Sequence, residues 1–153
     1  MALEVTSSAF GEGSTIPARY TCDGLDISPP LSWSTVPNAT QSLALIAEDP
    51  DAPRGSFVHW VIYTLPPDTR RLPEDIPNER TLPSGALQGM NGAGSIGYTG
   101  PCPPSGTHRY FFKVYALDTE LALGAGATGE DLMRAMEGHV LSEGRLLGTY
   151  QRG

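Results

Sequence analysis

The 153-residue sequence has few basic residues, few cysteines and no long apolar segment, and each shortage excludes a class of protein. Its 10 Lys and Arg residues stand against 17 Asp and Glu residues, so the net charge of −7 leaves no basic surface for nucleic acid. No segment reaches the apolar length of a membrane span, and no cationic stretch followed by an apolar one begins the sequence. We therefore expect a cytoplasmic protein that binds no nucleic acid and does not span a membrane.

The two cysteines, Cys22 and Cys102, are far apart in the sequence and outside metal-ligand spacings such as C-x-x-C. Two free thiols are therefore the default expectation, as is usual in the cytoplasm. At this length one domain, residues 1–153, can bury a substantial core without a metal or a disulfide. We expect neither a metal site nor a cofactor.

Glycine and proline are plentiful, at 18 and 14 residues, and both are spread along the whole chain. This distribution is typical of a β-rich protein with many turns. Apolar patterns predict three main strands, at residues 42–49, 57–65 and 108–117. The second of these is apolar on both faces, so we expect it to be central in its sheet. The Pro-rich segment 28–31 predicts an edge strand, and residues 68–105 predict long ordered loops.

Near the C-terminus the pattern changes to that of a helix. Thr128 can cap its start, and Gly144 is the expected end. His139 would lie on the apolar side of this helix, where we interpret it as structural packing. A final strand is predicted over residues 145–150.

Four polar residues end or interrupt the apolar faces of the three main strands: Asp49, His59, His108 and Tyr110. His59 is expected on the same face as Phe57, Val61 and Tyr63 because side chains alternate along a strand. Antiparallel pairing can bring all four polar residues to one end of a sheet. A single His in an apolar strand is more often a packed core residue, so the convergence is the signal.

Two imidazoles, a phenol and the backbone N–H groups of loop 100–106 suit a small anion such as phosphate or a carboxylate. Asp49 and Asp51 would then hydrogen-bond to the imidazoles and orient them. Other chemistries have weaker support. Neither Ser105 nor Cys102 lies in a recognised nucleophile motif, and the two His and a carboxylate lack the spacing of a metal site.

Two segments of the chain resemble the signatures of a known family. They are Asp49-Pro50-Asp51-Ala52-Pro53 followed by His59-Trp60, and Gly100-Pro101-Cys102-Pro103-Pro104 followed by Gly106 and His108-Arg109-Tyr110. They resemble the phosphatidylethanolamine-binding protein family, and the whole chain, including the segment Ser28-Pro29-Pro30-Leu31-Ser32-Trp33, is similar to its prokaryotic, Raf-kinase-inhibitor-like branch. The resemblance implies two packed antiparallel sheets in a Greek-key arrangement, with one or two peripheral helices and a small anion pocket.

Carried over by position, the family pocket falls on Asp49, Pro53, His59, Gly100, Pro101, His108 and Tyr110. The Ala52–Pro53 bond is a candidate cis peptide, because such bonds occur in tight, fixed turns. The resemblance also suggests that Cys22 and Cys102 lie close in space, since cysteines at like positions pair in exported members of the family.

The resulting functional hypothesis is a non-enzymatic binding protein for phosphate, phosphorylethanolamine or a carboxylate. A kinase or protease that it inhibits is a candidate partner, although eukaryotic members use surface outside the pocket for inhibition. The alternative is a hydrolase that uses His59 or His108 as a general base. The natural ligand and the oligomeric state, a homodimer included, stay open.

Overall fold

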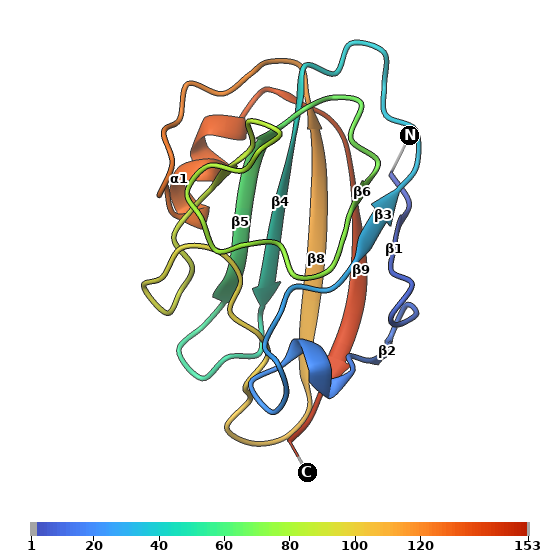
Figure 1. Ribbon diagram of the computed structural model, residues 1–153, viewed down its shortest axis with the longest axis vertical. Coiled ribbons are helices and arrows are strands. Elements are labelled where there is room, and N and C mark those ends of the chain that lie inside the picture. Colours follow the sequence, from blue (N-terminus) through green and yellow to red (C-terminus); the bar gives the residue numbers. More distant parts are fainter. Residues whose placement is uncertain (1–2, 153) are drawn as a thin grey trace.

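The computed structural model describes residues 3–152 and shows two β-sheets packed face to face, with one α-helix on the outer side of the larger sheet (Figure 1). The larger sheet runs in the order β2 (Ser14–Thr15), β9 (Val140–Tyr150), β8 (His108–Leu117), β4 (Ser42–Asp49), β5 (Phe57–Leu65) and β7 (Leu87–Gln88). The smaller sheet contains β1 (Val5–Thr6), β3 (Leu31–Trp33) and β6 (Arg71–Leu72). The mostly-β, two-sheet class predicted from the sequence is confirmed.

One strand pair departs from the antiparallel expectation. The short strand β2 runs parallel to β9, whereas the other strand pairs in both sheets are antiparallel. A short 3₁₀ helix, η1 (Ala18–Tyr20), follows β2, and the α-helix, α1 (Gly129–Met136), precedes β9. No helix in residues 3–152 is long and apolar enough to cross a membrane.

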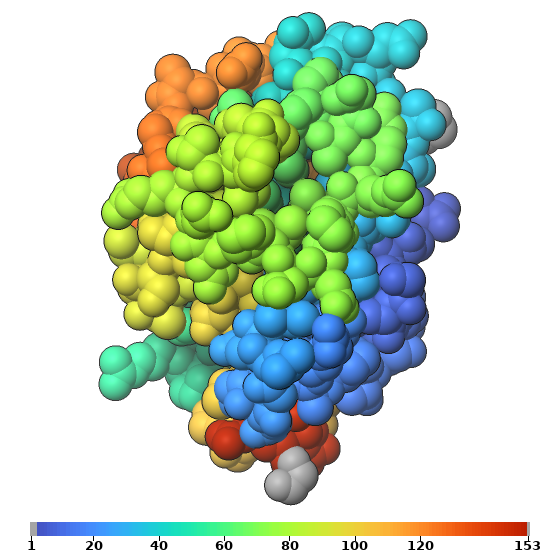
Figure 2. Space-filling model, viewed as in Figure 1, coloured from blue at the N-terminus to red at the C-terminus, as the bar shows by residue number. Residues whose placement is uncertain are grey.

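The main core lies between the two sheets. From the larger sheet it takes large side chains such as Trp60 and Phe112, and from the smaller sheet it takes Leu31 and Trp33. A second cluster lies on the other side of the larger sheet, where Leu132 and other residues of α1 cover it. Figure 2 shows loop residues, coloured green to yellow, covering much of the viewed face beside the blue N-terminal segment.

The three long central strands have the bounds that the apolar pattern predicted, 42–49, 57–65 and 108–117. The expectation that 57–65 is central is confirmed in the sense that it is not an edge strand, because β5 pairs with β4 on one side and with the two-residue strand β7 on the other. Its two apolar faces are explained by the two clusters, which bury one face each. The edge position predicted for the Pro-rich segment 28–31 is wrong, because β3 pairs with β1 on one side and with β6 on the other. The two prolines lie before the ladder, which begins at Leu31, as expected of residues that cannot donate to it.

The C-terminal helix is shorter than predicted. Thr128 and Asp131 form the expected cap with reciprocal hydrogen bonds, but the helix ends at Met136, and Gly138 then adopts a left-handed φ of 79°. Gly144 lies within β9, where a Cβ would meet the carbonyl oxygen of Leu3 at 2.0 Å. His139 is therefore outside the helix, and its Nδ1 contacts Asp118 Oδ1 at 2.8 Å instead of packing in a core.

Candidate functional site

A β-bulge in β5 determines where His59 points. In the ladder with β4, Glu48 lies opposite Val58 and Ala47 lies opposite Trp60, so the register shifts at His59. Two successive side chains at such a bulge can lie on the same side of the sheet. Trp60 belongs to the core between the sheets. His59 packs edge to face against Tyr110 of that core, with the two ring centroids 5.3 Å apart. The expectation that His59 shares a face with Val61 and Tyr63 is therefore wrong, since these two belong to the cluster under α1. The expected neighbour Phe57 does lie beside it, with the two ring centroids 4.8 Å apart.

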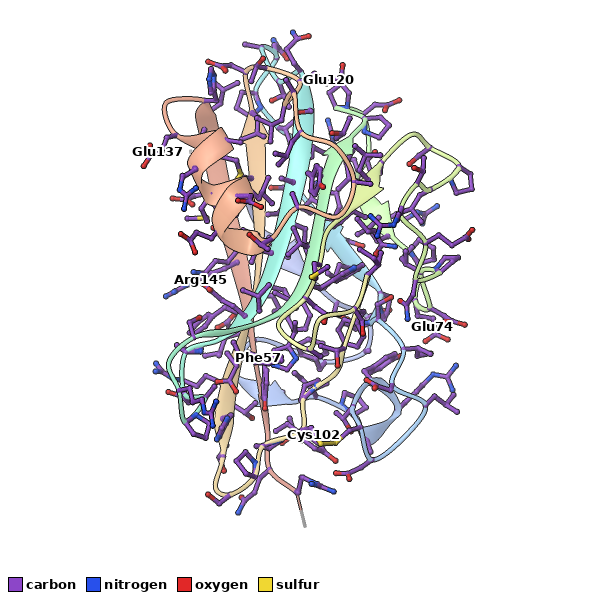
Figure 3. The ribbon with its side chains drawn as sticks, turned by 90° about the vertical axis from the view of Figure 1, so that its left-hand side faces the viewer. Phe57, Glu74, Cys102, Glu120, Glu137 and Arg145 are labelled. Carbon is purple, nitrogen blue, oxygen red and sulfur yellow. A yellow bond between two sulfur atoms is a disulfide. The ribbon has the colours of Figure 1, made fainter. Side chains whose placement is uncertain are left out.

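The bulge places His59 beside the other polar strand-end residues, around one cavity of about 190 Å³. Of the residues predicted from the sequence, six line this cavity: Asp49, Pro53, His59, Gly100, His108 and Tyr110. Asp51 and Pro101 do not. Figure 3 shows two labelled residues that line the cavity, Phe57 and Cys102, in the lower half of the molecule, away from Glu120 and Glu137.

The orientation of His59 is fixed by a backbone carbonyl. Its Nδ1 lies 2.7 Å from the Thr99 oxygen, and because a carbonyl can only accept, Nδ1 carries the hydrogen. In the neutral ring Nε2 is then a hydrogen-bond acceptor. Burial is the main cause that lowers the pKa of His59, and the Thr99 contact and the Asp49 carboxylate oppose this in part.

His108 is oriented by a carboxylate instead. Its Nδ1 lies 2.6 Å from Asp49 Oδ2, and both side chains are buried. The other oxygen of Asp49 accepts from the backbone N–H of Asp51 at 2.7 Å. The predicted orienting contact of Asp49 is thus present in the structure. Because this contact engages Nδ1, only Nε2 of the His108 ring is left to meet a ligand.

Asp51 does not contact an imidazole, contrary to the prediction. Its carboxylate accepts from the backbone N–H and the Nε–H of Arg109 at 2.9 Å each, and from Nη2 at 2.9 Å through the other oxygen. These bonds to Arg109 lower the pKa of Asp51 to about 2. Asp51 therefore ties the turn after β4 to β8.

Tyr110 brings an unpaired polar atom to the site. The residue is 2% exposed, and its hydroxyl is buried without a hydrogen-bond partner. Burial raises the pKa of Tyr110, so the hydroxyl keeps its proton. A buried hydroxyl without a partner is costly, and this one is a free donor on a side chain that lines the cavity.

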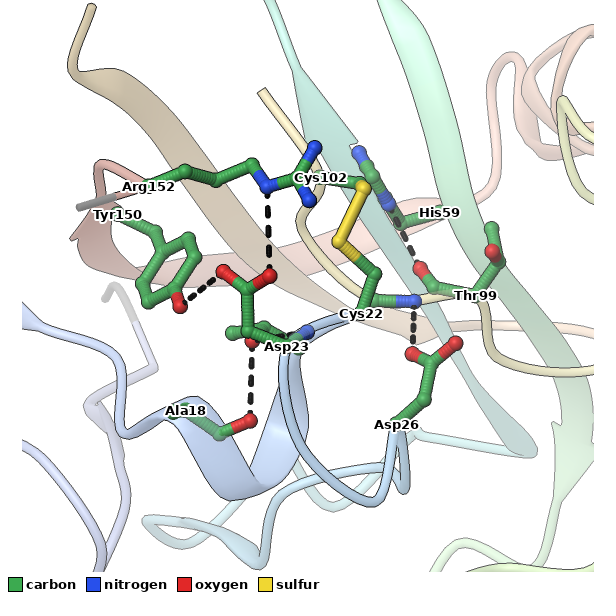
Figure 4. Close-up of a disulfide and its surroundings, with 11 residues drawn as sticks. Ala18, Cys22, Asp23, Asp26, His59, Thr99, Cys102, Tyr150 and Arg152 are labelled. Carbon is green, nitrogen blue, oxygen red and sulfur yellow. Dashed lines mark hydrogen bonds and ion pairs between the residues drawn. A yellow bond between two sulfur atoms is a disulfide. The ribbon is translucent and has the colours of Figure 1, made fainter. Parts of the chain in front are cut away.

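A disulfide joins the loop that carries Thr99 to the segment after η1 (Figure 4). Cys22 and Cys102 are bonded, with their Cα atoms 5.5 Å apart, and the Cys22 N–H donates to the Pro101 carbonyl at 3.1 Å. The default expectation of two free thiols is therefore wrong for this structure, and the proximity of the two cysteines is confirmed. The Gly100 N–H donates to Asp26 at 2.7 Å.

The expectation of a cis bond at Ala52–Pro53 is also wrong, because residues 3–152 contain no cis peptide bond. The turn closes with a trans bond, through a hydrogen bond of 3.1 Å from the Gly55 N–H to the Ala52 carbonyl and a φ of 97° at Gly55. The trans form of an X–Pro bond is favoured by about 0.5–1 kcal/mol unless a turn demands otherwise.

Several lining residues were not predicted: Ala52, Phe57, Thr99, Cys102, Pro103 and Pro104. Phe57 could have been found, since it lies two residues before His59 on an apolar strand. Thr99 and the supporting Asp26 carry no sequence signal, because their roles depend on loops that meet only in the fold. Cys102 is bonded to Cys22 and is no nucleophile in this state, and Ser105 does not line the cavity.

Residues 6–151 match the family model of the phosphatidylethanolamine-binding protein. The chain belongs to this family. It is 56% identical over 151 residues to a UPF0098 protein of Methanothermobacter thermautotrophicus, which covers 99% of this chain and 100% of that protein. It is 50% identical to a protein of the same group from Pyrococcus horikoshii, over 99% of this chain and 78% of the relative.

Solved structures agree with this assignment. The crystal structure of a homologue of the phosphatidylethanolamine-binding protein from Chlamydia trachomatis has a TM-score of 0.91 at 45% identity, over 99% of both chains. Escherichia coli YbcL, described as a member of the mammalian family, has a TM-score of 0.91 at 32% identity, over 100% of both chains.

Proposed function

We propose that the chain binds a small phosphate- or carboxylate-bearing anion in the cavity between His59 and His108. One observation carries this proposal. The hydroxyl of Tyr110 is buried without a partner, beside two imidazoles whose Nδ1 atoms are already engaged. A ligand in the cavity would supply the missing partner for Tyr110 and would meet the two Nε2 atoms.

The size of the cavity supports a small ligand. A volume of about 190 Å³ exceeds that of a single water, which takes about 30 Å³ of the liquid. It is smaller than the pockets of about 300–1,000 Å³ that take drug-sized ligands. An ion or a short head group fits this range. The proposal concerns the anion alone, because inhibition of a kinase or protease would require a protein surface that the cavity does not identify.

A hydrolase is the second candidate, and the His108–Asp49 contact favours it. A histidine held through Nδ1 by a carboxylate is the arrangement of a general base, which would act on a water near Nε2. The cavity lining provides neither a serine nor a free thiol. Such an enzyme would therefore have to activate water directly.

Calorimetric titration and thermal unfolding with phosphate, phosphorylethanolamine and acetate test the proposal. We expect saturable binding of phosphate at neutral pH and of the other two anions at acid pH, with a rise in melting temperature, because a ligand of the folded state stabilises it by mass action. Tyr110→Phe should weaken binding, and His139→Gln, which changes a histidine at the other end of β8 and β9, should not. Binding that is absent from the wild type, or unchanged in Tyr110→Phe, would contradict the proposal. Turnover of phosphoesters or peptides that is lost in Asp49→Asn would favour the hydrolase.

A further inference from the structure

We propose that the cavity selects anions that carry a proton on an oxygen. Hydrogen phosphate and singly protonated phosphate monoesters meet this condition, whereas sulfate and phosphate diesters do not. This inference rests on the proposed function and specifies the ligand of the same site. It follows from the number of acceptors and donors that the side chains present to the cavity.

The first acceptor is Nε2 of His59. Because Nδ1 must donate to the Thr99 carbonyl, the neutral ring can present only a lone pair at Nε2. An anion oxygen without a hydrogen would bring its own lone pair against that lone pair. A P–OH group would instead donate to Nε2, so a proton on the ligand changes repulsion into a hydrogen bond.

Protonation of His59 would remove this restriction, and the surroundings of the ring oppose it. The charged and titratable groups that act on it are Asp49 from β4, His108 from β8 and Asp26 from the loop after η1. Burial outweighs the two carboxylates and lowers the pKa of His59. The direct partner of Nδ1 is a neutral carbonyl, which balances no positive charge.

His108 differs in that respect. A proton on its Nε2 makes a cation whose charge is balanced by Asp49 Oδ2, 2.6 Å from Nδ1. The two imidazoles are therefore unequal: His108 can donate to an anion with its charge compensated, and His59 is held as an acceptor. The Tyr110 hydroxyl adds a further donor.

Asp49 is the second acceptor at the cavity. Each of its oxygens accepts one N–H, from His108 and from the backbone of Asp51, and each keeps further lone-pair capacity. A carboxylate in the wall repels the oxygen of an aprotic anion. A hydrogen on the ligand would let the carboxylate accept instead, which is the same preference that His59 imposes.

The comparison of phosphate with sulfate tests the inference directly, because the two ions are alike in shape and in charge at about pH 7.5. At this pH phosphate keeps at least one hydrogen and sulfate keeps none. We expect phosphate to bind about tenfold more tightly or better, the usual effect of one unpaired buried polar group. Equal affinity for the two ions at the same site, shown by competition, would overturn the inference and leave anion binding standing. Absence of binding by both ions would overturn the proposed function as well.

Methyl phosphate and dimethyl phosphate show whether the site takes the phosphate of a monoester or that of a lipid, which is a diester. The diester has no hydrogen and represents a lipid head group, so it should bind as poorly as sulfate. The monoester loses its hydrogen above a pKa of about 6, so its affinity relative to inorganic phosphate should fall between about pH 5.5 and pH 8. The ratio cancels any titration of the protein that affects both ions. A dimethyl phosphate affinity equal to that of phosphate would contradict the inference.

Variants test whether His59 is the residue that causes the preference for phosphate over sulfate. His59→Gln can turn an amide N–H toward the ligand, so the ratio of phosphate to sulfate affinity should fall toward one. Tyr110→Phe removes a donor that serves both ions, so it should weaken both and leave the ratio unchanged. His139→Gln should change neither. If His59→Gln fails to fold, the wild-type ratio still decides. A His59→Gln ratio equal to that of the wild type would contradict the role of His59.

Discussion

His108 and Asp49 form a buried pair, and His139 and Asp118 form an exposed pair of the same chemistry. The Nδ1 to Oδ distances are 2.6 Å and 2.8 Å, whereas the side chains are 9% and 5% exposed in the first pair and 44% and 41% in the second. The protein thus contains its own control for the effect of burial on a His–Asp contact.

The first prediction compares these pairs. Asp49→Ala should lower the free energy of unfolding by about 1–3 kcal/mol, because it leaves a buried imidazole N–H without its partner. Asp118→Ala should cost about 0–1 kcal/mol, as exposed pairs usually do. Chemical denaturation of both variants measures the difference. Equal losses would show that the buried pair gains nothing from its surroundings.

Replacement of Tyr110 by phenylalanine should separate stability from binding. The hydroxyl is buried without a partner, so its removal should leave the free energy of unfolding unchanged or raise it by about 1 kcal/mol. The affinity for phosphate should fall in the same variant. Denaturation and calorimetry on one preparation give both values. A clear loss of stability would mean that the hydroxyl has a partner in the unliganded protein.

The disulfide should support both the fold and the pocket. The bond joins residues 80 positions apart, so its loss should cost up to about 4.5 kcal/mol in the chain-entropy description. Cys22→Ser should also weaken anion binding, because Cys102 and Thr99 belong to the same loop of the cavity wall. Alkylation followed by mass spectrometry is the check on the starting material. Two labelled thiols without a reductant would contradict the bond.

Acetate binding should tighten as the pH falls. Acetate carries no proton near neutral pH, so it needs a proton on His59 Nε2, and uptake of that proton becomes easier below the ordinary His value of about 6.5. Calorimetry in two buffers of different ionisation enthalpy measures the proton uptake, which should vanish in His59→Gln. Binding of acetate without uptake of a proton would contradict the assigned state of His59.

In the free protein, the free energy of unfolding should fall as the pH falls, whereas the affinity for acetate should rise. The pKa of His59 is lowered on folding, so below about 6.5 the unfolded chain takes up a proton that the folded chain resists. The contribution of His59 is therefore fully present above that pH and is lost as the pH falls toward the folded pKa. Asp51 acts only at lower pH, where its stabilising pair with Arg109 is lost as the pH falls from 3.8 toward about 2. Chemical denaturation of the wild type and of His59→Gln measures this effect. Their free energies of unfolding should converge as the pH falls from about 6.5 toward the folded pKa of His59.

Much of the fold followed from local pattern. Strands β4, β5 and β8 are dense in apolar and β-branched residues, so their bounds could be predicted. The end of α1 was predicted too late, at Gly144, because the apolar pattern continues past Gly138 and only the pairing of β9 shows that this part of the chain is a strand.

The site was predictable as a group of residues but not as a set of contacts. Asp49, His59, His108 and Tyr110 stood out as polar residues on apolar faces, and the structure brings them together. The partner of Asp51 is Arg109, which is 58 positions away, and no local pattern selects it over an imidazole. The face of His59 was predicted wrongly because the bulge depends on how β4 and β5 pair, which the sequence of β5 alone does not show.

That bulge makes the site depend on a single extra residue. Deletion of one residue at Val58 would restore regular alternation in β5 and move the imidazole to the side that α1 covers, while the strand pairs that define the sandwich would remain. The same architecture could thus persist through descent with the cavity emptied of one histidine. Among proteins of this shape, the spacing between Asp49 and His59 is a better guide to a shared ligand than the shape itself.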